Sequence, residues 1–149
     1  MVGRFFEEFE VGEELVTPAR TVTEADIVMF SGLSGDYSPH HTDDEFCKTL
    51  PFKGKIAHGP LVIAISSGLI VSLNLWRETA LALMEMNVKF KGATVMGDTI
   101  RVFVKVSDKK ETKKGDKGIV TFDQIVKNQR DEELAEMRWL MMIRTKSSA

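Results

Sequence analysis

An aspartate and a histidine five residues apart are the side chains of this sequence best suited to acid/base chemistry. They are Asp36 and His41, and the run Gly35-Asp36-Tyr37-Ser38-Pro39-His40-His41 holds them on either side of a proline. A carboxylate and an imidazole can divide the removal and the delivery of a proton, each worth about 10²–10⁴-fold in rate. Taken alone, Asp36 in a Gly-Asp sequence is also a common turn former, so both interpretations stand.

A glycine-proline pair follows in the run Ile56-Ala57-His58-Gly59-Pro60, at the start of an apolar segment. Pro60 suits the first turn of a helix, because an N–H at that position would have no partner within the helix. The N–H of Gly59 would then lie at the positive end of the helix, where it can stabilise an oxyanion. The two runs together predict an acid/base pair beside an oxyanion-stabilising helix N-terminus.

The first half of the chain must supply the elements that hold these groups. A first strand is expected near 5–9 or across 14–19. Thr23, with Asp26 three residues later, resembles a capping box and predicts a short helix. The stretch 31–41 is rich in Gly, Ser, Asp and Pro, so it is expected to be a loop.

The next elements lead directly to the glycine-proline pair. Thr42 is a second candidate N-cap, for a short helix that ends by Pro51, and 52–58 is expected to be a loop. The main helix is predicted from Pro60 to about Trp76. Because its residues are apolar on nearly every face, this helix should be buried all round.

The second half of the chain alternates apolar and polar residues, which is the pattern of half-buried antiparallel strands. Four runs carry it, at 82–90, 100–106, 120–126 and 135–143. One buried helix with a curved antiparallel sheet around it is the simplest packing of these elements, so the predicted fold class is α+β.

Composition sets the broad class of protein. At 149 residues the chain is expected to form a single domain, 1–149, and its net charge of −2 with interspersed signs argues against nucleic-acid binding. The single Cys47 cannot form an internal disulfide and there is no apolar N-terminal run, so a cytoplasmic location is expected. The longest apolar run, Leu61–Leu75, is interrupted by polar residues and is shorter than the ~20 that span a bilayer, which argues against a membrane protein.

Four segments, in order, resemble the MaoC-like dehydratases, the (R)-specific enoyl-CoA hydratase family with the hot-dog fold. Phe30–Asp36 is similar to the family's lead-in to its catalytic loop, and Asp36–His41 resembles its D-x-N-P-x-H motif. Ile56–Gly59 resembles the I-A-H-G segment at the start of the hot-dog helix, and Phe90–Thr99 its F…G-D-T turn. The resemblance covers most of the chain.

The resemblance implies roles for individual residues. Asp36 and His41 would be the catalytic pair, the backbone N–H of Gly59 the oxyanion donor, and Ser67 a serine that supports the site. Ser67 on a buried helix can equally bond back to a carbonyl one turn earlier. His58 is expected either in the site, in contact with substrate, or in a structural hydrogen bond to the adjacent loop.

The sequence departs from the family pattern in two places. Ser38 stands where the family usually has asparagine, which is expected to adjust the geometry of the turn rather than abolish activity. Gly92 and Ala93 stand where the family has a proline, which leaves details of the acyl pocket open.

The implied activity is hydration of a trans-2-enoyl-CoA to an (R)-3-hydroxyacyl-CoA, with Asp36 activating water and His41 donating the proton. Coenzyme A would be part of the substrate, so no separate cofactor is expected. Its phosphates would meet basic residues, and Lys53 and Lys55 are the candidates, although each can equally be an ordinary surface lysine. A homodimer or a dimer of dimers is the expected assembly.

Three other interpretations remain open. A thioesterase of the same fold would use a carboxylate to direct water at the carbonyl carbon, but that reaction includes no protonation of the α-carbon. A non-catalytic acyl-CoA binding protein would need neither Asp36 nor His41. A metal site built from His40, His41, Asp43, Asp44 and His58 matches no standard zinc spacing, so no metal is expected.

Overall fold

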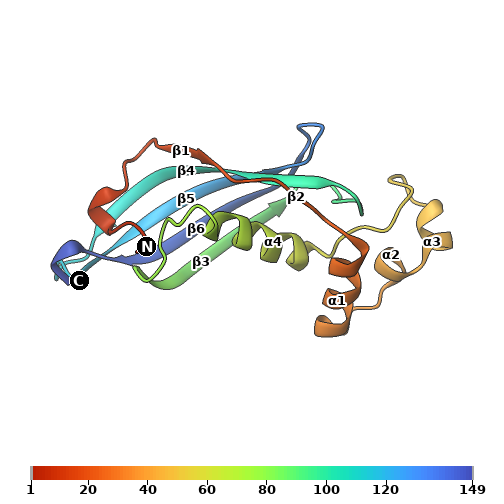
Figure 1. Ribbon diagram of the computed structural model, residues 1–149, viewed down its shortest axis with the longest axis horizontal. Coiled ribbons are helices and arrows are strands. Elements are labelled where there is room, and N and C mark those ends of the chain that lie inside the picture. Colours follow the sequence, from red (N-terminus) through yellow and green to blue (C-terminus); the bar gives the residue numbers. More distant parts are fainter. Residues whose placement is uncertain (1, 149) are drawn as a thin grey trace.

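A strongly curved antiparallel sheet with one helix against its concave side forms the body of the protein. The computed structural model, which describes residues 2–148, arranges the strands in the order β1-β4-β5-β6-β3 (Figure 1). The strands are β1 Glu14–Val16, β3 Ala80–Phe90, β4 Thr99–Glu111, β5 Lys117–Lys127 and β6 Glu133–Arg144, and the short β2, Arg20–Thr21, also pairs with β4. The α+β prediction is confirmed.

The core lies between α4, Gly59–Val71, and the inner faces of β4, β5 and β6. Alternation along these three strands directs one residue in two at the helix, as predicted. Trp139 on β6 lies opposite Phe122 on β5, whose ring meets the ring of Trp76 edge-on at 5.0 Å. The helix is therefore fixed by a closely packed apolar layer on one side.

The helix is shorter and less enclosed than expected. It ends at Val71 rather than near Trp76, because the Ser72 hydroxyl donates to the carbonyl of Leu69 and Asn74 adopts a left-handed backbone conformation. Pro60 and Val71 are exposed, so one face of the helix is not covered by the sheet. The expectation that the helix is buried all round is wrong.

Strand β3 departs most from the predicted alternation. Its register with β6 is interrupted between Ala80 and Ala82 and again between Leu83 and Glu85. After each interruption the alternating side chains point to the opposite face of the sheet. As the last strand of the sheet it also lacks a neighbour on one side. Its large apolar residues are exposed as a result, and they are Leu81, Leu83, Met84, Met86 and Phe90.

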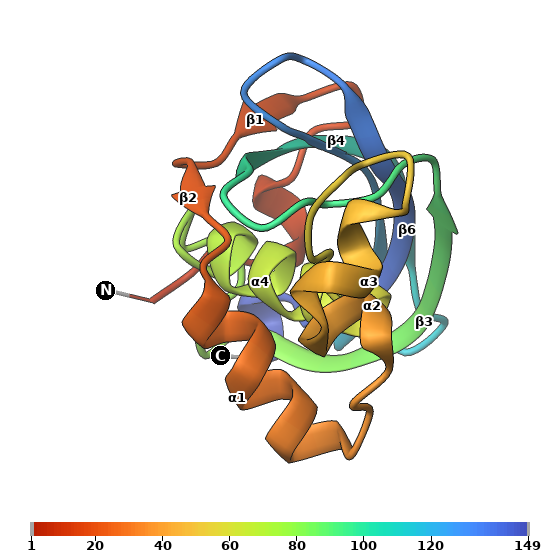
Figure 2. The same ribbon diagram turned by 90° about the vertical axis from the view of Figure 1, so that its right-hand side faces the viewer.

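Three helices cover the end of the molecule toward which the N-terminus of α4 points (Figure 2). They are α1 Glu24–Ser34, α2 Pro39–Thr42 and α3 Asp44–Lys48. The capping box at Thr23 is confirmed, since its hydroxyl accepts from the N–H of Asp26 and its own N–H donates to the Asp26 carboxylate at 2.8 Å.

The boundaries of these helices differ from the predicted ones. The expected loop at 31–41 is shorter, because α1 continues to Ser34 before Gly35 turns the chain at a φ of 77°. Asp43 rather than Thr42 caps α3, accepting from the N–H of Phe46 at 2.9 Å. The Thr42 hydroxyl instead donates to the carbonyl of Tyr37, so it closes the preceding turn.

The N-terminal segment is anchored on the sheet by one lysine and one aromatic ring. The region 5–9 is a 3₁₀ turn, Phe6–Glu8, so of the two expected positions for a first strand only 14–19 contains one. The Lys109 ammonium donates to the carbonyls of Phe6 at 3.0 Å and Phe9 at 2.8 Å.

Among residues 2–148, no helix is long and apolar enough to cross a bilayer.

Gly118→Ala should destabilise the protein, because the ring of Phe6 occupies the space beside Gly118. A Cβ there would lie 2.2 Å from Phe6 Cδ2, so the ring or the strand must shift, at a cost of about 1–3 kcal/mol. Urea unfolding measures the loss. Gly92→Ala is the matched control, since its Cβ would meet nothing nearer than 3.7 Å and should change stability by less than about 0.5 kcal/mol. Equal losses in the two variants would contradict this account of the packing.

Candidate active site

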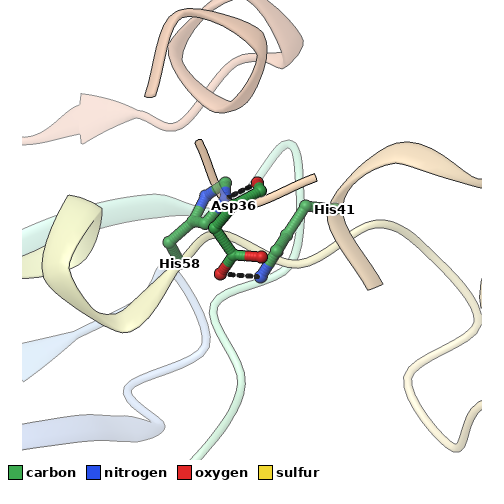
Figure 3. Close-up of side chains that lie close together, drawn as sticks. All are labelled: Asp36, His41 and His58. Atoms are coloured by element: carbon green, nitrogen blue, oxygen red, sulfur yellow. Dashed lines mark hydrogen bonds and ion pairs between the residues drawn. The ribbon is translucent and has the colours of Figure 1, made fainter. Parts of the chain in front are cut away.

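Asp36 and His41 face each other at the end of the molecule covered by α1 to α3. The Asp36 Oδ2 and His41 Nε2 atoms are 3.8 Å apart (Figure 3). The carboxylate side chain is 47% exposed and the imidazole 11%, so the pair opens to solvent on the side of the aspartate. This separation leaves both groups in reach of one small molecule such as water.

The orientation of His41 is set by the backbone of the segment that leads into α4. Its Nδ1 lies 2.7 Å from the carbonyl oxygen of Ile56. A carbonyl can only accept, so Nδ1 carries the hydrogen and Nε2 is the nitrogen that faces Asp36. The neutral ring therefore offers a lone pair at Nε2, and the protonated ring offers an N–H at the same place.

Asp36 is held in its ionised form by the residue that departs from the family motif. The hydroxyl and the backbone N–H of Ser38 both donate to Asp36 Oδ1. These two bonds lower the pKa of the Asp36 carboxyl below its usual value, and the bond from the hydroxyl has the larger effect. The nearby imidazoles act in the same direction. Ser38 is thus a donor to the aspartate, and the second carboxylate oxygen remains free to act on His41 or on water.

The N-terminus of α4 presents an unused backbone donor. Gly59 is the first residue of the helix and Pro60 follows it, and the N–H of Gly59 has no acceptor within the described part of the chain. The ring of Phe90 lies directly against Gly59, where an added Cβ would be 2.7 Å from Phe90 Cζ. An added side chain would therefore displace the Phe90 ring, and glycine leaves its own N–H open to close approach. The sequence did not indicate this role of Phe90.

His58 lies behind the pair rather than at its open side. It is 3% exposed, and its ring stacks on that of His41 with centroids 3.6 Å apart and planes at 22°. Its Nε2 lies 3.0 Å from the backbone carbonyl of Asp36 and 3.4 Å from the Ser31 hydroxyl. Of the two interpretations of this histidine, the structure provides the hydrogen bond to the adjacent loop.

The remaining predicted site residues have other surroundings. Ser67 is half-buried on α4, and its neighbour Ser66 is the one that is fully buried. Lys53 is exposed, whereas Lys55 is buried and paired with Glu24 and Asp44. The hydrogen bond to Glu24 raises the pKa of Lys55 despite its burial. The charge of Lys55 is thus already compensated, and a role for Lys53 at coenzyme A stays a prediction.

Donor atoms of Asp36, His41 and His58 also lie within 4.8 Å of one another, as in some metal sites. This set shares two histidines with the set considered from the sequence, but it contains neither Asp43 nor Asp44. Because the two rings are stacked, their in-plane lone pairs run side by side and do not converge on one point. Acid/base chemistry fits the arrangement better than metal ligation.

Comparison with known proteins gives a consistent picture. A family model described as "MaoC like domain" matches residues 7–128. The chain is 33% identical over 109 residues to the (R)-specific enoyl-CoA hydratase of Rhodospirillum rubrum, covering 72% of each protein. It is 39% identical over 99 residues to Protein MaoC of Klebsiella aerogenes, and there the match covers 66% of this chain but only 29% of that protein.

A solved structure described as the monoamine oxidase regulatory protein from Archaeoglobus fulgius superposes with a TM-score of 0.89 at 33% identity. The match covers 98% of this chain and 97% of the other. The sheet wrapped around α4 is the hot-dog fold, as the resemblance implied.

Ser38→Ala should raise the pKa of the Asp36 carboxyl toward the ordinary value of an aspartate, because the hydroxyl bond to the ionised form is lost. The carboxylate of the variant would then become protonated at a higher pH than in the wild type. A ¹³C NMR titration of the Asp36 carboxyl measures this directly. Ser38→Thr keeps the hydroxyl and should titrate like the wild type. An unchanged titration in Ser38→Ala would show that the hydroxyl does not hold the charge.

Proposed function

This chain belongs to the MaoC-like domain family, and we propose that it interconverts trans-2-enoyl-CoA and (R)-3-hydroxyacyl-CoA thioesters. The observation that carries the proposal is the Asp36–His41 pair beside the unused N–H of Gly59. The relative from Rhodospirillum rubrum supports the acyl class and the stereochemistry through its name, (R)-specific enoyl-CoA hydratase.

The three groups divide the hydration step between them. Asp36 Oδ2 takes a proton from water as the water oxygen bonds to the β-carbon. The π electrons of the double bond move toward the thioester, and the N–H of Gly59 stabilises the negative charge that develops on its oxygen. The protonated His41 gives the proton on Nε2 to the α-carbon, so the atoms of water are all accounted for.

The position of Asp36 Oδ2 supports this assignment, because it faces His41 Nε2 and both atoms are in reach of one water molecule. The lowered pKa of Asp36 keeps the carboxylate ionised and able to accept a proton, and it makes the carboxylate a weaker base that readily releases that proton afterwards. His41 Nε2 lies 3.8 Å from Asp36 Oδ2 and must be reprotonated after each turnover. Proton transfer from Asp36 to His41 would close the cycle without a further group, and coenzyme A enters only as part of the substrate.

The assembly we propose is a homodimer in which the β3 strands of two copies pair. A long exposed edge strand with large apolar residues is a surface that natural proteins otherwise protect. Antiparallel pairing of β3 with its own copy would continue the sheet across a two-fold axis. Because Phe90 lies on β3 and contacts Gly59, this interface would adjoin the site and help to close it to water.

Asp36→Asn should abolish hydration of crotonyl-CoA, followed as loss of absorbance of the conjugated thioester. The amide can still accept from Ser38 but cannot take a proton, so kcat should fall by about 10²–10⁴-fold. Glu45→Gln, an exposed change on α3, should keep wild-type activity. Release of free thiol by the wild type would instead indicate a thioesterase. Binding without turnover across short, long and branched enoyl-CoAs would indicate a binding protein.

Met86→Glu should prevent dimer formation, because it places a charge in the middle of the exposed apolar edge of β3. Light scattering after gel filtration should give the mass of two chains for the wild type and of one chain for the variant. Val11→Glu adds the same charge in the turn before β1, at the opposite edge of the sheet, and should leave the dimer intact. A wild type that elutes as a monomer at micromolar concentration would refute pairing through β3.

A further inference from the structure

The imidazole of His58 fills the space between the catalytic pair and helix α1. One of its faces stacks on His41 at 3.6 Å. The ring of Phe30, on α1, lies 5.0 Å from it at an interplanar angle of 54°. With both neighbours in place the side chain is 3% exposed, so it does not open toward the side of the site where Asp36 meets solvent.

The hydrogen bonds of His58 fix which nitrogen carries its hydrogen. Nε2 lies 3.0 Å from the carbonyl oxygen of Asp36, and because a carbonyl only accepts, Nε2 must be the donor. Nδ1 is buried and has no hydrogen-bond partner in residues 2–148. The surroundings therefore satisfy the form protonated on Nε2, and the bond to the backbone of Asp36 depends on it.

Neither catalytic side chain stands on a long element of its own. Asp36 lies in 35–38, which has no regular secondary structure, and His41 lies on the four-residue α2. His58 immediately precedes α4, whose body is fixed in the core, and the next residue along the chain is Gly59. One side chain thus connects the aspartate, the histidine and the oxyanion donor to the same helix terminus.

We propose that His58 is a positioning residue that holds both members of the pair in register with the N–H of Gly59. This inference rests on the proposed function. The stack keeps the plane of His41 at the angle that directs Nε2 to Asp36, and the Nε2–H bond holds the backbone from which Asp36 projects. Substrate does not touch His58, so this role takes the place of the substrate contact expected from the sequence.

Three substitutions separate the two contacts. His58→Phe keeps an aromatic face for His41 and removes the donor. His58→Gln removes the ring but keeps an N–H where Nε2 lies, and His58→Ala removes both. We expect kcat to fall by about 10²-fold in the alanine variant, since a misplacement of about 1 Å can cost that much. The Phe and Gln variants should each lose less, and KM should stay within about threefold of wild type throughout.

His40→Gln is the matched control. His40 is adjacent to His41 in sequence and exposed, and its ring centroid is 6.3 Å from that of His41 without stacking. It should leave kcat unchanged. A KM that rises while kcat stays constant in the His58 variants would show that His58 binds substrate, which would overturn the proposal.

The second readout needs no substrate and tests the stack directly. The sequence has only three histidines, so the Cε1–H resonance of each can be assigned from single variants by ¹H–¹³C NMR. The ring current of His58 should shift the His41 resonance. That shift should disappear in His58→Gln and persist, altered in size, in His58→Phe.

The two readouts separate the possible failures. An unchanged His41 resonance in His58→Gln would refute the stack. Equal loss of kcat in all three variants, in proportion to a fall in melting temperature, would mean a merely structural role and would also refute the proposal. If the wild type hydrates none of the enoyl-CoAs offered, the proposed function fails, whereas the NMR comparison still decides whether His58 orients His41.

Discussion

The structure depends on one requirement at the start of α4, where the helix body must be buried while its first N–H stays unpaired. Burial against β4, β5 and β6 fixes the helix axis, and proline at the second position removes one donor that would otherwise need a partner. The N-terminus of α4, the positive end of the helix dipole, therefore presents the unpaired N–H of Gly59. A longer N-terminal extension of the helix would satisfy that donor internally and remove the site.

The other candidate site residues are brought to this point by short segments, each held through backbone atoms. His41 is oriented by the carbonyl of Ile56, His58 by the carbonyl of Asp36, and Asp36 by the N–H and hydroxyl of Ser38. These bonds link 35–41 to 56–59, two stretches that are separated in the chain. The geometry is therefore a property of two loops packed on a helix end, and the charged pairs of Lys55 with Glu24 and Asp44 hold the covering helices against them.

The sequence was informative where a repeating pattern coincides with burial. Alternation located β4, β5 and β6, and the Thr23–Asp26 box located the start of α1, because both signals come from local geometry. Alternation also located β3, but it did not predict that the apolar residues of this strand are exposed, because bulges interrupt the pattern and the strand lies at the edge of the sheet. The short helix α2 and the end of α4 at Val71 are set by individual side-chain hydrogen bonds, which a periodic sequence pattern does not report.

For the candidate site, the motifs predicted that Asp36 and His41 lie together near the start of α4, as they do, but not which side chains pack behind them. The stack of His41 on His58 and the contact of Phe90 with Gly59 join residues 17 and 31 positions apart, and both are decided by the packing of separate segments. The contact of Phe90 with Gly59 has a consequence for how such a chain can diverge. An added side chain at position 59 would displace the ring at 90, so the two positions are coupled and the effect of a change at Gly59 depends on which residue stands at 90. A smaller residue at 90 would lower the cost of a substitution at 59.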